Sequence, residues 1–252
     1  MSKFLIIANW KANPDKLSEA INLAKKTEVG VSAARNIEVV IAPPFPFLPE
    51  VKKVIKKVRL GAQDAFSDSG PFTGEVSWKE LSDLGVEYAL VGHSERRSIL
   101  GESNEIINRK IKALLKNKIK TVLCVGEKER SGAEIPEEVG DQLKKDLEDV
   151  RPADIKNLII AYEPIWAIST NPEAKADTPA NAFQALIYIR KILTALFGAN
   201  SIKGVRIIYG GSVRSGNIVS FLEDGKMEGA LVGGASLNIQ EFSEIVSKAS
   251  AI

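Results

Sequence analysis

The sequence has a single cysteine, Cys124, and a single histidine, His93. One cysteine excludes an intramolecular disulfide, which fits a reducing compartment such as the cytosol. One histidine excludes a metal site built from several imidazoles. Any histidine chemistry therefore depends on His93 alone.

Long apolar runs and excess charge of one sign are also absent. The run from Lys3 to Asn9 is too short for a secretory signal, and no stretch approaches the ~20 apolar residues that span a bilayer. The net charge of +2 gives no reason to expect nucleic acid or an anionic membrane as a partner. We therefore expect a cytoplasmic protein without membrane or nucleic-acid partners.

Short, continuous apolar runs alternate with segments of helical spacing. The runs cover residues 4–8, 37–42, 58–62, 88–92, 121–125, 158–162, 205–209 and 229–232, and the clearest helical segments cover residues 15–27, 102–117, 137–149, 179–197 and 239–248. Continuous runs are typical of parallel strands buried on both faces, and the alternation indicates βα units. Eight units predict a closed (β/α)8 barrel in the α/β class, with parallel strands and outer helices. An open, doubly wound sheet is the alternative.

No low-complexity or Pro/Ser-rich linker divides the chain. Its 252 residues are within the usual size of one such barrel. We therefore expect residues 1–252 to form a single domain.

Three chemically active side chains follow predicted strands at the end where such barrels carry their sites. Lys11 is a compact cation suited to an anionic substrate, although most of the chain's lysines must simply be solvated. His93 precedes a short helix expected to begin at Ser94, and a helix start disfavours the imidazolium. Glu163 follows a buried strand directly, and is either a general base or a salt-bridged residue of the rim.

Paired glycines follow the last two predicted strands. Gly210-Gly211-Ser212 and Gly233-Gly234 can bring backbone N–H groups close to an oxyanion. The loops after strands 7 and 8 are the usual phosphate site of these barrels. Together with His93 and Glu163, these segments favour proton abstraction next to a carbonyl on a phosphorylated substrate.

The motifs at these strand ends resemble, in order and over the whole length, those of the triosephosphate isomerase family. The matching segments are Asn9-Trp10-Lys11, Phe72-Thr73-Gly74-Glu75-Val76-Ser77, Gly92-His93-Ser94-Glu95-Arg96-Arg97, Cys124-Val125-Gly126-Glu127, Tyr162-Glu163-Pro164-Ile165-Trp166-Ala167-Ile168, Tyr209-Gly210-Gly211-Ser212-Val213 and Leu231-Val232-Gly233-Gly234-Ala235-Ser236-Leu237. Seven segments in order are a specific match.

The resemblance implies interconversion of dihydroxyacetone phosphate and glyceraldehyde 3-phosphate without cofactor or metal. It gives Glu163 the role of the base and neutral His93 that of the acid that polarises the carbonyl. Lys11 and Asn9 hold the substrate, and Glu95 orders the site. Ser169, Ser212, Gly233 and Gly234 are expected to hold the phosphate.

The resemblance also implies assembly. The segment around Thr73 and Glu75 is similar to the loop that enters a partner subunit in this family. We expect at least a homodimer, with a tetramer possible, and Glu75 near Arg96.

The sequence departs from the family in two places. Asp64 stands where the family usually has asparagine, a change expected to matter little. After the sixth strand the family's Ala-Ile-Gly-Thr-Gly-Lys is replaced by a segment about three residues longer, in which Ser169 and Asn171 take the glycine positions. Serine can still donate its N–H and asparagine tolerates a left-handed conformation. We expect residues 167–176 to form a working lid with the Ser169 N–H on the phosphate.

Two other functions are compatible with a barrel. Another phosphate-binding β/α barrel enzyme, such as an aldolase or a biosynthetic isomerase, would be favoured by a Schiff-base lysine inside a strand, and strands 5 to 7 offer none. A catalytically silent scaffold would show loss of Glu163 or His93, and both are present.

Overall fold

The computed structural model describes residues 4–132, 134–168 and 174–252. Its strands form a closed parallel barrel in chain order. They are β1 (Phe4–Asn9), β2 (Ile37–Ala42), β3 (Arg59–Ala62), β4 (Tyr88–Val91), β5 (Lys120–Val125), β6 (Leu158–Tyr162), β7 (Arg206–Tyr209) and β8 (Gly229–Val232). Because β1 pairs with both β2 and β8, the sheet has no edge, and the open-sheet alternative is excluded.

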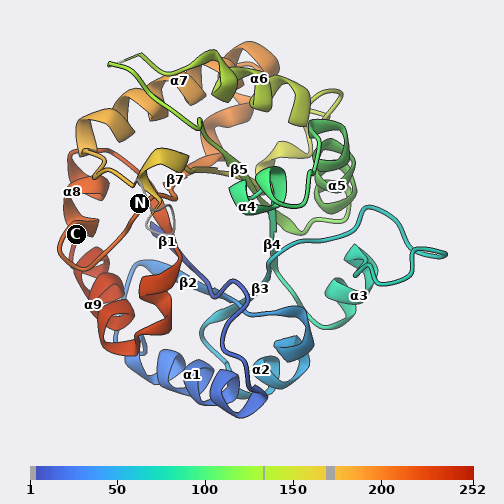
Figure 1. Cartoon of the computed structure of the whole chain (residues 1–252), viewed down its shortest axis with the longest axis vertical. Coiled ribbons are helices and arrows are strands. Elements are labelled where there is room, and N and C mark those ends of the chain that lie inside the picture. Colours follow the sequence, from blue (N-terminus) through green and yellow to red (C-terminus); the bar gives the residue numbers. More distant parts are fainter. Residues whose placement is uncertain (1–3, 133, 169–173) are drawn as a thin grey trace.

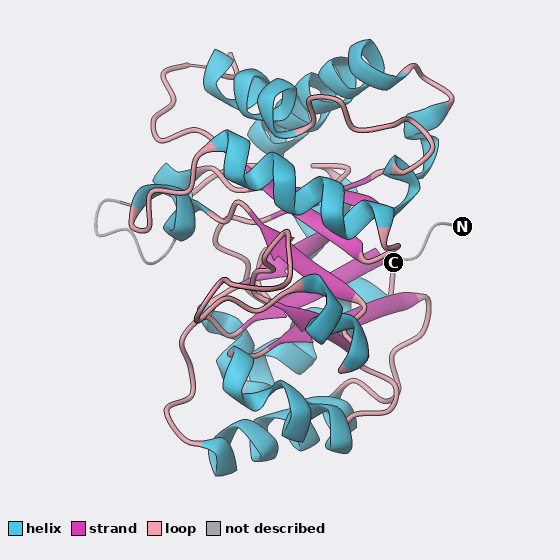
Figure 2. Ribbon diagram, turned by 90° about the vertical axis from the view of Figure 1, so that its right-hand side faces the viewer, coloured by secondary structure: helices cyan, strands magenta, loops and turns pink. Residues whose placement is uncertain are grey.

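The helices surround the barrel as an outer ring (Figure 1). They are α1 (Leu17–Gly30), α2 (Leu48–Val54), α3 (Trp78–Asp83), α4 (Ser94–Ser98), α5 (Asn104–Lys116), α6 (Glu137–Asp146), α7 (Pro179–Phe197), α8 (Ile218–Glu223) and α9 (Ile239–Ser250). Seen from the side, helices cover the sheet above and below (Figure 2). None of the helices in the described part of the chain is long and apolar enough to cross a membrane.

The five expected helices are present, with shifted ends. The first runs from Leu17 to Gly30 rather than over residues 15–27. The second begins at Asn104 rather than at residue 102, because the Ser103 side chain caps it by accepting a hydrogen bond from the Ile106 N–H. The helix expected over residues 137–149 ends at Asp146. The expected short helix at Ser94 is confirmed as α4.

Two apolar layers hold the barrel together. Residues that point inward fill its interior, and those that point outward pack against the helices. The inward group consists of Leu5, Ile7, Val40, Ala42, Tyr88, Leu90, Val122, Cys124, Ile159, Ala161, Ile208 and Leu231. Burial on both faces explains why the strands are continuous apolar runs.

The amino-terminal end of the barrel is closed by a charged cluster around Glu38. Its carboxylate accepts a hydrogen bond from Lys120 at 2.9 Å and contacts the Arg206 guanidinium at 3.2 Å. Burial by itself would raise the pKa of Glu38, but hydrogen bonds with Tyr88 and Lys120 and the charges of Lys120 and Arg206 outweigh it and lower the pKa to about 2. The ionised carboxylate is therefore a stabilising group of this end.

Replacing Glu38 by glutamine should lower the free energy of unfolding at pH 7 by about 1–2 kcal/mol, a value reduced for water screening of a partly exposed group. The folded-state pKa lies below the unfolded value of 4.5. The stabilisation is therefore present above that pH and is lost as the pH falls towards about 2. Urea unfolding of both proteins across this range checks the prediction. A difference between them that stays constant down to the lowest pH would contradict it.

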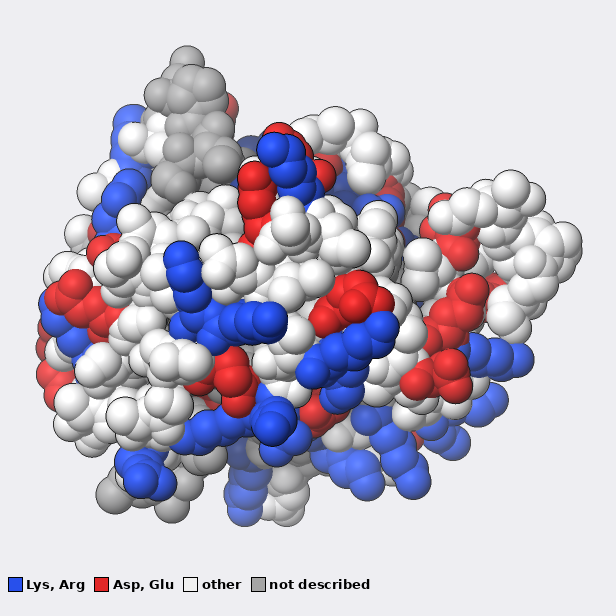
Figure 3. Space-filling model, turned by 90° about the horizontal axis from the view of Figure 1, so that it is seen from below, with Lys and Arg blue, Asp and Glu red and all other residues white. Residues whose placement is uncertain are grey.

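The segment between β3 and α3, which includes residues 66–77, extends away from the ring (Figure 1). The matching projection at the right of Figure 3 is largely uncharged, whereas Lys and Arg alternate with Asp and Glu over the rest of that face. Phe72 in this segment is 41% exposed and packs on Phe66, with ring centroids 4.8 Å apart. The segment thus presents an aromatic side chain away from the barrel.

Candidate active site

A cavity of about 330 Å³ opens at the carboxyl ends of the strands. It is lined by residues from the ends of five strands. They include Asn9, Lys11, His93, Glu163, Gly210, Gly211, Ser212, Gly233 and Gly234. The structure therefore brings together the residues predicted for catalysis and most of those predicted for phosphate binding.

His93 is oriented by the helix that follows it. Gly92 has φ +71°, a left-handed conformation that turns the chain out of β4, and His93 is the N-cap residue of α4. The His93 Nδ1 accepts a hydrogen bond from the Glu95 N–H at 3.2 Å. A nitrogen that accepts carries no proton, so in this arrangement the imidazole proton lies on Nε2. Nε2 is 3.3 Å from the Glu163 Oε1.

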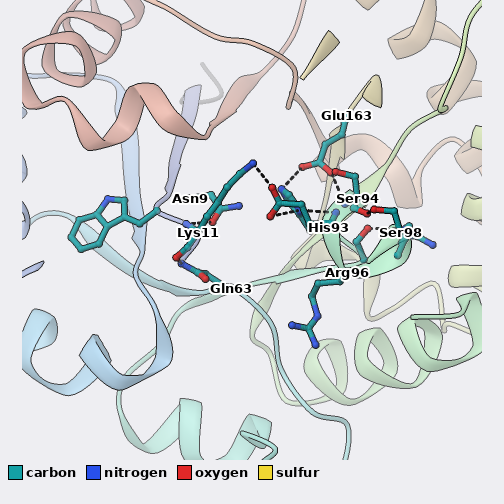
Figure 4. A network of polar contacts seen from close by, with 12 residues as sticks. Asn9, Lys11, Gln63, His93, Ser94, Arg96, Ser98 and Glu163 are labelled. Atoms are coloured by element: carbon teal, nitrogen blue, oxygen red, sulfur yellow. Dashed lines mark hydrogen bonds and ion pairs between the residues drawn. The ribbon is translucent and has the colours of Figure 1, made fainter. Parts of the chain in front are cut away.

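Glu163 is almost completely buried, at 2% exposure. Its Oε2 accepts a hydrogen bond from the Ser94 N–H, the first residue of α4, at 3.2 Å (Figure 4). A Cβ on Gly210 would lie 2.6 Å from the Glu163 Cγ, and one on Gly126 would lie 1.8 Å from the Glu163 carbonyl oxygen. The glycines after β5 and β7 therefore make room for this glutamate, a role that the sequence did not indicate.

Cys124 lies on β5 and points into the barrel, where the Glu163 carboxylate influences its thiol electrostatically. Burial raises the pKa of the Cys124 thiol, and the charge of Glu163 raises it further. The Cys124 thiol is thus kept in its protonated form beside this carboxylate. Sequence reasoning used this cysteine to exclude a disulfide and as part of the matching segment Cys124-Val125-Gly126-Glu127, but gave it no role at the site.

Lys11 is held in an uncommon backbone conformation, with φ +53°. Its N–H donates to the Asn9 Oδ1 at 3.0 Å, and its carbonyl accepts from the Gln63 Nε2 at 2.7 Å. Its ammonium forms an ion pair with Glu95, and a Cβ on Gly233 would lie 3.6 Å from its Cε. Asn9, Glu95 and Gln63 together hold Lys11 beside Gly233, and Figure 4 shows Asn9, Lys11 and Gln63 next to one another.

Ser212 lines the cavity, but both its donors are used within the protein. Its N–H and its hydroxyl donate to the Ala167 carbonyl, at 3.2 and 2.7 Å. Ser169 lies outside the described residues. The flanks of that segment are tied down by Lys175, whose N–H donates to the Trp166 carbonyl at 2.9 Å, and by Asp177, which accepts from the Tyr209 hydroxyl at 3.0 Å. Sequence reasoning did not single out Asp177 or Tyr209.

Trp166 and Tyr162 fix the start of the same segment. The Trp166 Nε1 and the Tyr162 hydroxyl both donate to the Glu127 Oε1, at 2.9 and 2.8 Å. Burial raises the pKa of Glu127, and these two hydrogen bonds act in the opposite direction. Among the described residues, no group of His, Cys, Asp and Glu is placed to hold a metal ion.

Thr73 and Glu75 lie on the projecting segment, and within the described residues Glu75 forms no ion pair. Arg96 pairs instead with Asp64 and Glu102 of the same chain. Another cavity, of about 260 Å³, is lined by Lys11 and His93 on one side and by Arg96, Ile99 and Leu100 on the other. One copy of the chain does not bring the predicted assembly residues together.

Comparison with known proteins agrees with this geometry. The family model described as Triosephosphate isomerase matches residues 4–249. Proteins named triosephosphate isomerase from Alkaliphilus metalliredigens and Thermoanaerobacter pseudethanolicus are 39% and 41% identical to this chain. In both cases the match covers 98% of this chain and all of the relative, and a protein of the same name from Clostridium botulinum is 38% identical over the same extent. The barrel, the cavity at its carboxyl end and these matches show that the chain belongs to the triosephosphate isomerase family and is an isomerase of triose phosphates.

Proposed function

We propose that this cavity interconverts dihydroxyacetone phosphate and D-glyceraldehyde 3-phosphate through an enediolate, with Glu163 as the base and His93 as the acid. The observation that carries the assignment is the 3.3 Å approach of Glu163 Oε1 to His93 Nε2 inside one cavity. A base and a proton donor this close can act on adjacent carbons and oxygens of a three-carbon substrate.

Glu163 removes the proton next to the carbonyl. In this structure its Oε2 accepts a hydrogen bond from the Ser94 N–H, and its Oε1 lies 3.3 Å from the His93 Nε2. Release of the Ser94 hydrogen bond would free the carboxylate to reach a substrate carbon.

His93 donates its Nε2 proton to the substrate's carbonyl oxygen. The Glu95 N–H occupies Nδ1, so Nε2 is the nitrogen available as a donor. A neutral imidazole can give this proton to one substrate oxygen and recover one from the other. His93 thereby moves a proton between the two oxygens of the enediolate.

Lys11 and Asn9 hold the substrate and offset the negative charge that develops on it, and Glu95 positions Lys11. Gly233 and Gly234 offer backbone N–H groups to the phosphate, with Ser212 and Ser169 as further donors. Ser212 would have to exchange its bond to Ala167 for one to the phosphate. No cofactor or metal is required for these steps.

Among the described residues that line the cavity, Lys11 is the only lysine available for a Schiff base. Lys120 lies on β5 but pairs with Glu38 at the opposite end. Lys110 lies on α5 outside the barrel and pairs with Asp64. The isomerase assignment is therefore preferred to an aldolase.

The assembly we propose is a cytoplasmic homodimer, with a tetramer as the larger alternative. The projecting segment around Thr73 and Glu75 would enter the 260 Å³ cavity of a second copy, beside Arg96. Exposed Ile99 and Leu100, at 76% and 62%, would be covered. A chain that sediments as a monomer and keeps full activity on dilution would contradict the dimer.

The reaction itself is tested with glyceraldehyde 3-phosphate in a coupled assay run in D₂O. We expect rapid formation of dihydroxyacetone phosphate that carries deuterium at the carbon where the proton was returned. Product that carries no deuterium would count against an enediolate intermediate whose proton, held by the base, exchanges with solvent. Absence of turnover would favour a silent barrel.

A further inference from the structure

Four charged side chains form a cluster between β3, α4 and α5. Asp64 follows β3, Arg96 belongs to α4, Glu102 precedes α5 and Lys110 lies within α5. The Lys110 ammonium contacts Asp64 at 2.7 and 2.9 Å and Glu102 at 2.6 Å. Arg96 contacts Asp64 through Nη2 at 2.9 Å and Glu102 through Nε at 2.6 Å.

The cluster is buried and its charges cancel. Asp64 and Lys110 are 3% and 2% exposed, and two cations face two carboxylates. Buried charges are tolerated only when they are well paired. Asp64 supplies the second negative charge, which an asparagine at this position would not.

Arg96 also lies at the edge of the proposed dimer contact. Its side chain is 30% exposed and borders the 260 Å³ cavity. Its guanidinium points away from Glu163 and His93 (Figure 4). Glu75 of the partner subunit would approach Arg96 from the exposed side.

We propose that Asp64 neutralises Arg96 within its own protomer, so that Glu75 of the partner subunit adds no net ion-pair stabilisation to the dimer. The inference rests on the dimer proposed above. The interface is then held by apolar groups, with Phe72 of one copy against Ile99 and Leu100 of the other.

The net charge of the cluster decides whether Glu75 of the partner subunit stabilises the dimer. Glu75 would bring a third carboxylate to two cations and leave a net charge of −1, while losing its own hydration. With asparagine at position 64 the cluster would carry +1, and the same glutamate would restore neutrality. The contribution of Glu75 should therefore depend on the residue at position 64.

A double-mutant cycle on the full chain tests this dependence. The variants are Glu75→Gln, Asp64→Asn and the double substitution, with Asp83→Asn on α3 as a control that removes an exposed carboxylate. The dimer dissociation constant of each is measured by sedimentation. Burial raises the pKa of Asp64, so the measurements are made at about pH 8, far above the ordinary pKa of a carboxyl group.

We expect Glu75→Gln to change the dissociation constant by less than about threefold in the wild-type and Asp83→Asn backgrounds. In the Asp64→Asn background it should weaken the dimer by about tenfold or more. Equal weakening of tenfold in all backgrounds would overturn the role of Asp64 while leaving the dimer intact. A wild-type chain that is monomeric at every concentration would overturn the dimer and this inference with it.

A second measurement needs no change at position 64, in case Asp64→Asn does not fold. The dissociation constants of the wild-type and Glu75→Gln dimers are compared between about 0.05 and 0.5 M salt. We expect the same salt dependence for both. A steeper loss of affinity for the wild type would show an ion pair at Glu75 and overturn the proposal.

Discussion

Replacing Glu163 by glutamine is expected to reduce kcat by about 10³-fold or more, with a much smaller change in KM. The substitution keeps the size of the side chain and its hydrogen bond from the Ser94 N–H, but removes the group that takes the proton. General-base catalysis is typically worth about 10²–10⁴-fold, and the loss should fall almost entirely on kcat because the base acts only in the transition state. Steady-state kinetics in both directions provide the measurement.

A matched control is Glu241→Gln. Glu241 lines the same cavity, but its carboxylate accepts hydrogen bonds from the Ser215 N–H and hydroxyl at the rim. Its substitution should leave kcat within a few-fold of the wild type. A folded Glu163→Gln protein with near-full turnover would show that another group is the base.

Replacing His93 by asparagine is expected to lower kcat by about 10²–10⁴-fold in a protein that remains folded. Asparagine can still accept the Glu95 N–H as the cap of α4, so the helix should persist. It cannot exchange a proton between the two substrate oxygens. The rate of solvent exchange at carbon should fall less than the rate of full turnover, since Glu163 is still present.

The protonation of His93 can be observed directly because it is the only histidine. We expect ¹⁵N NMR of the active protein at pH 7 to show a neutral ring with the proton on Nε2. The physical basis is the Glu95 N–H, which points at Nδ1 and leaves no space for a second proton there. An imidazolium at this pH would rule out the neutral-acid assignment, even if His93→Asn were inactive.

The positions of the proposed catalytic groups could be predicted because of a property of parallel strands. Lys11, His93 and Glu163 each follow an apolar run, and strands that are parallel and adjacent end at the same face. Residues that directly follow these strands could therefore be predicted to lie close together, without any knowledge of side-chain contacts. The start of the helix at Ser94 could also be predicted, because it depends only on the turn of the chain that follows Gly92.

Short helices, and the exact residues at which helices end, were harder to predict from the sequence. The segments that form α2, α3 and α8 are six or seven residues long and give too few turns for a clear apolar period. Their formation depends on packing against the barrel. The end of α6 at Asp146 likewise reflects tertiary contacts, because Arg97 reaches the Asp146 carboxylate from α4.

By itself, the sequence determined the alternation of strands and helices, the end of the barrel that carries the chemistry and the family. These depend on local periodicity and on residues placed directly after strands. Only the tertiary structure decided that β1 closes onto β8, that Glu163 accepts a hydrogen bond from the Ser94 N–H, and that Asp64 pairs with both Arg96 and Lys110. Each of these contacts joins residues far apart in the chain, and their geometry is set by how the elements pack, which the order of residues does not express.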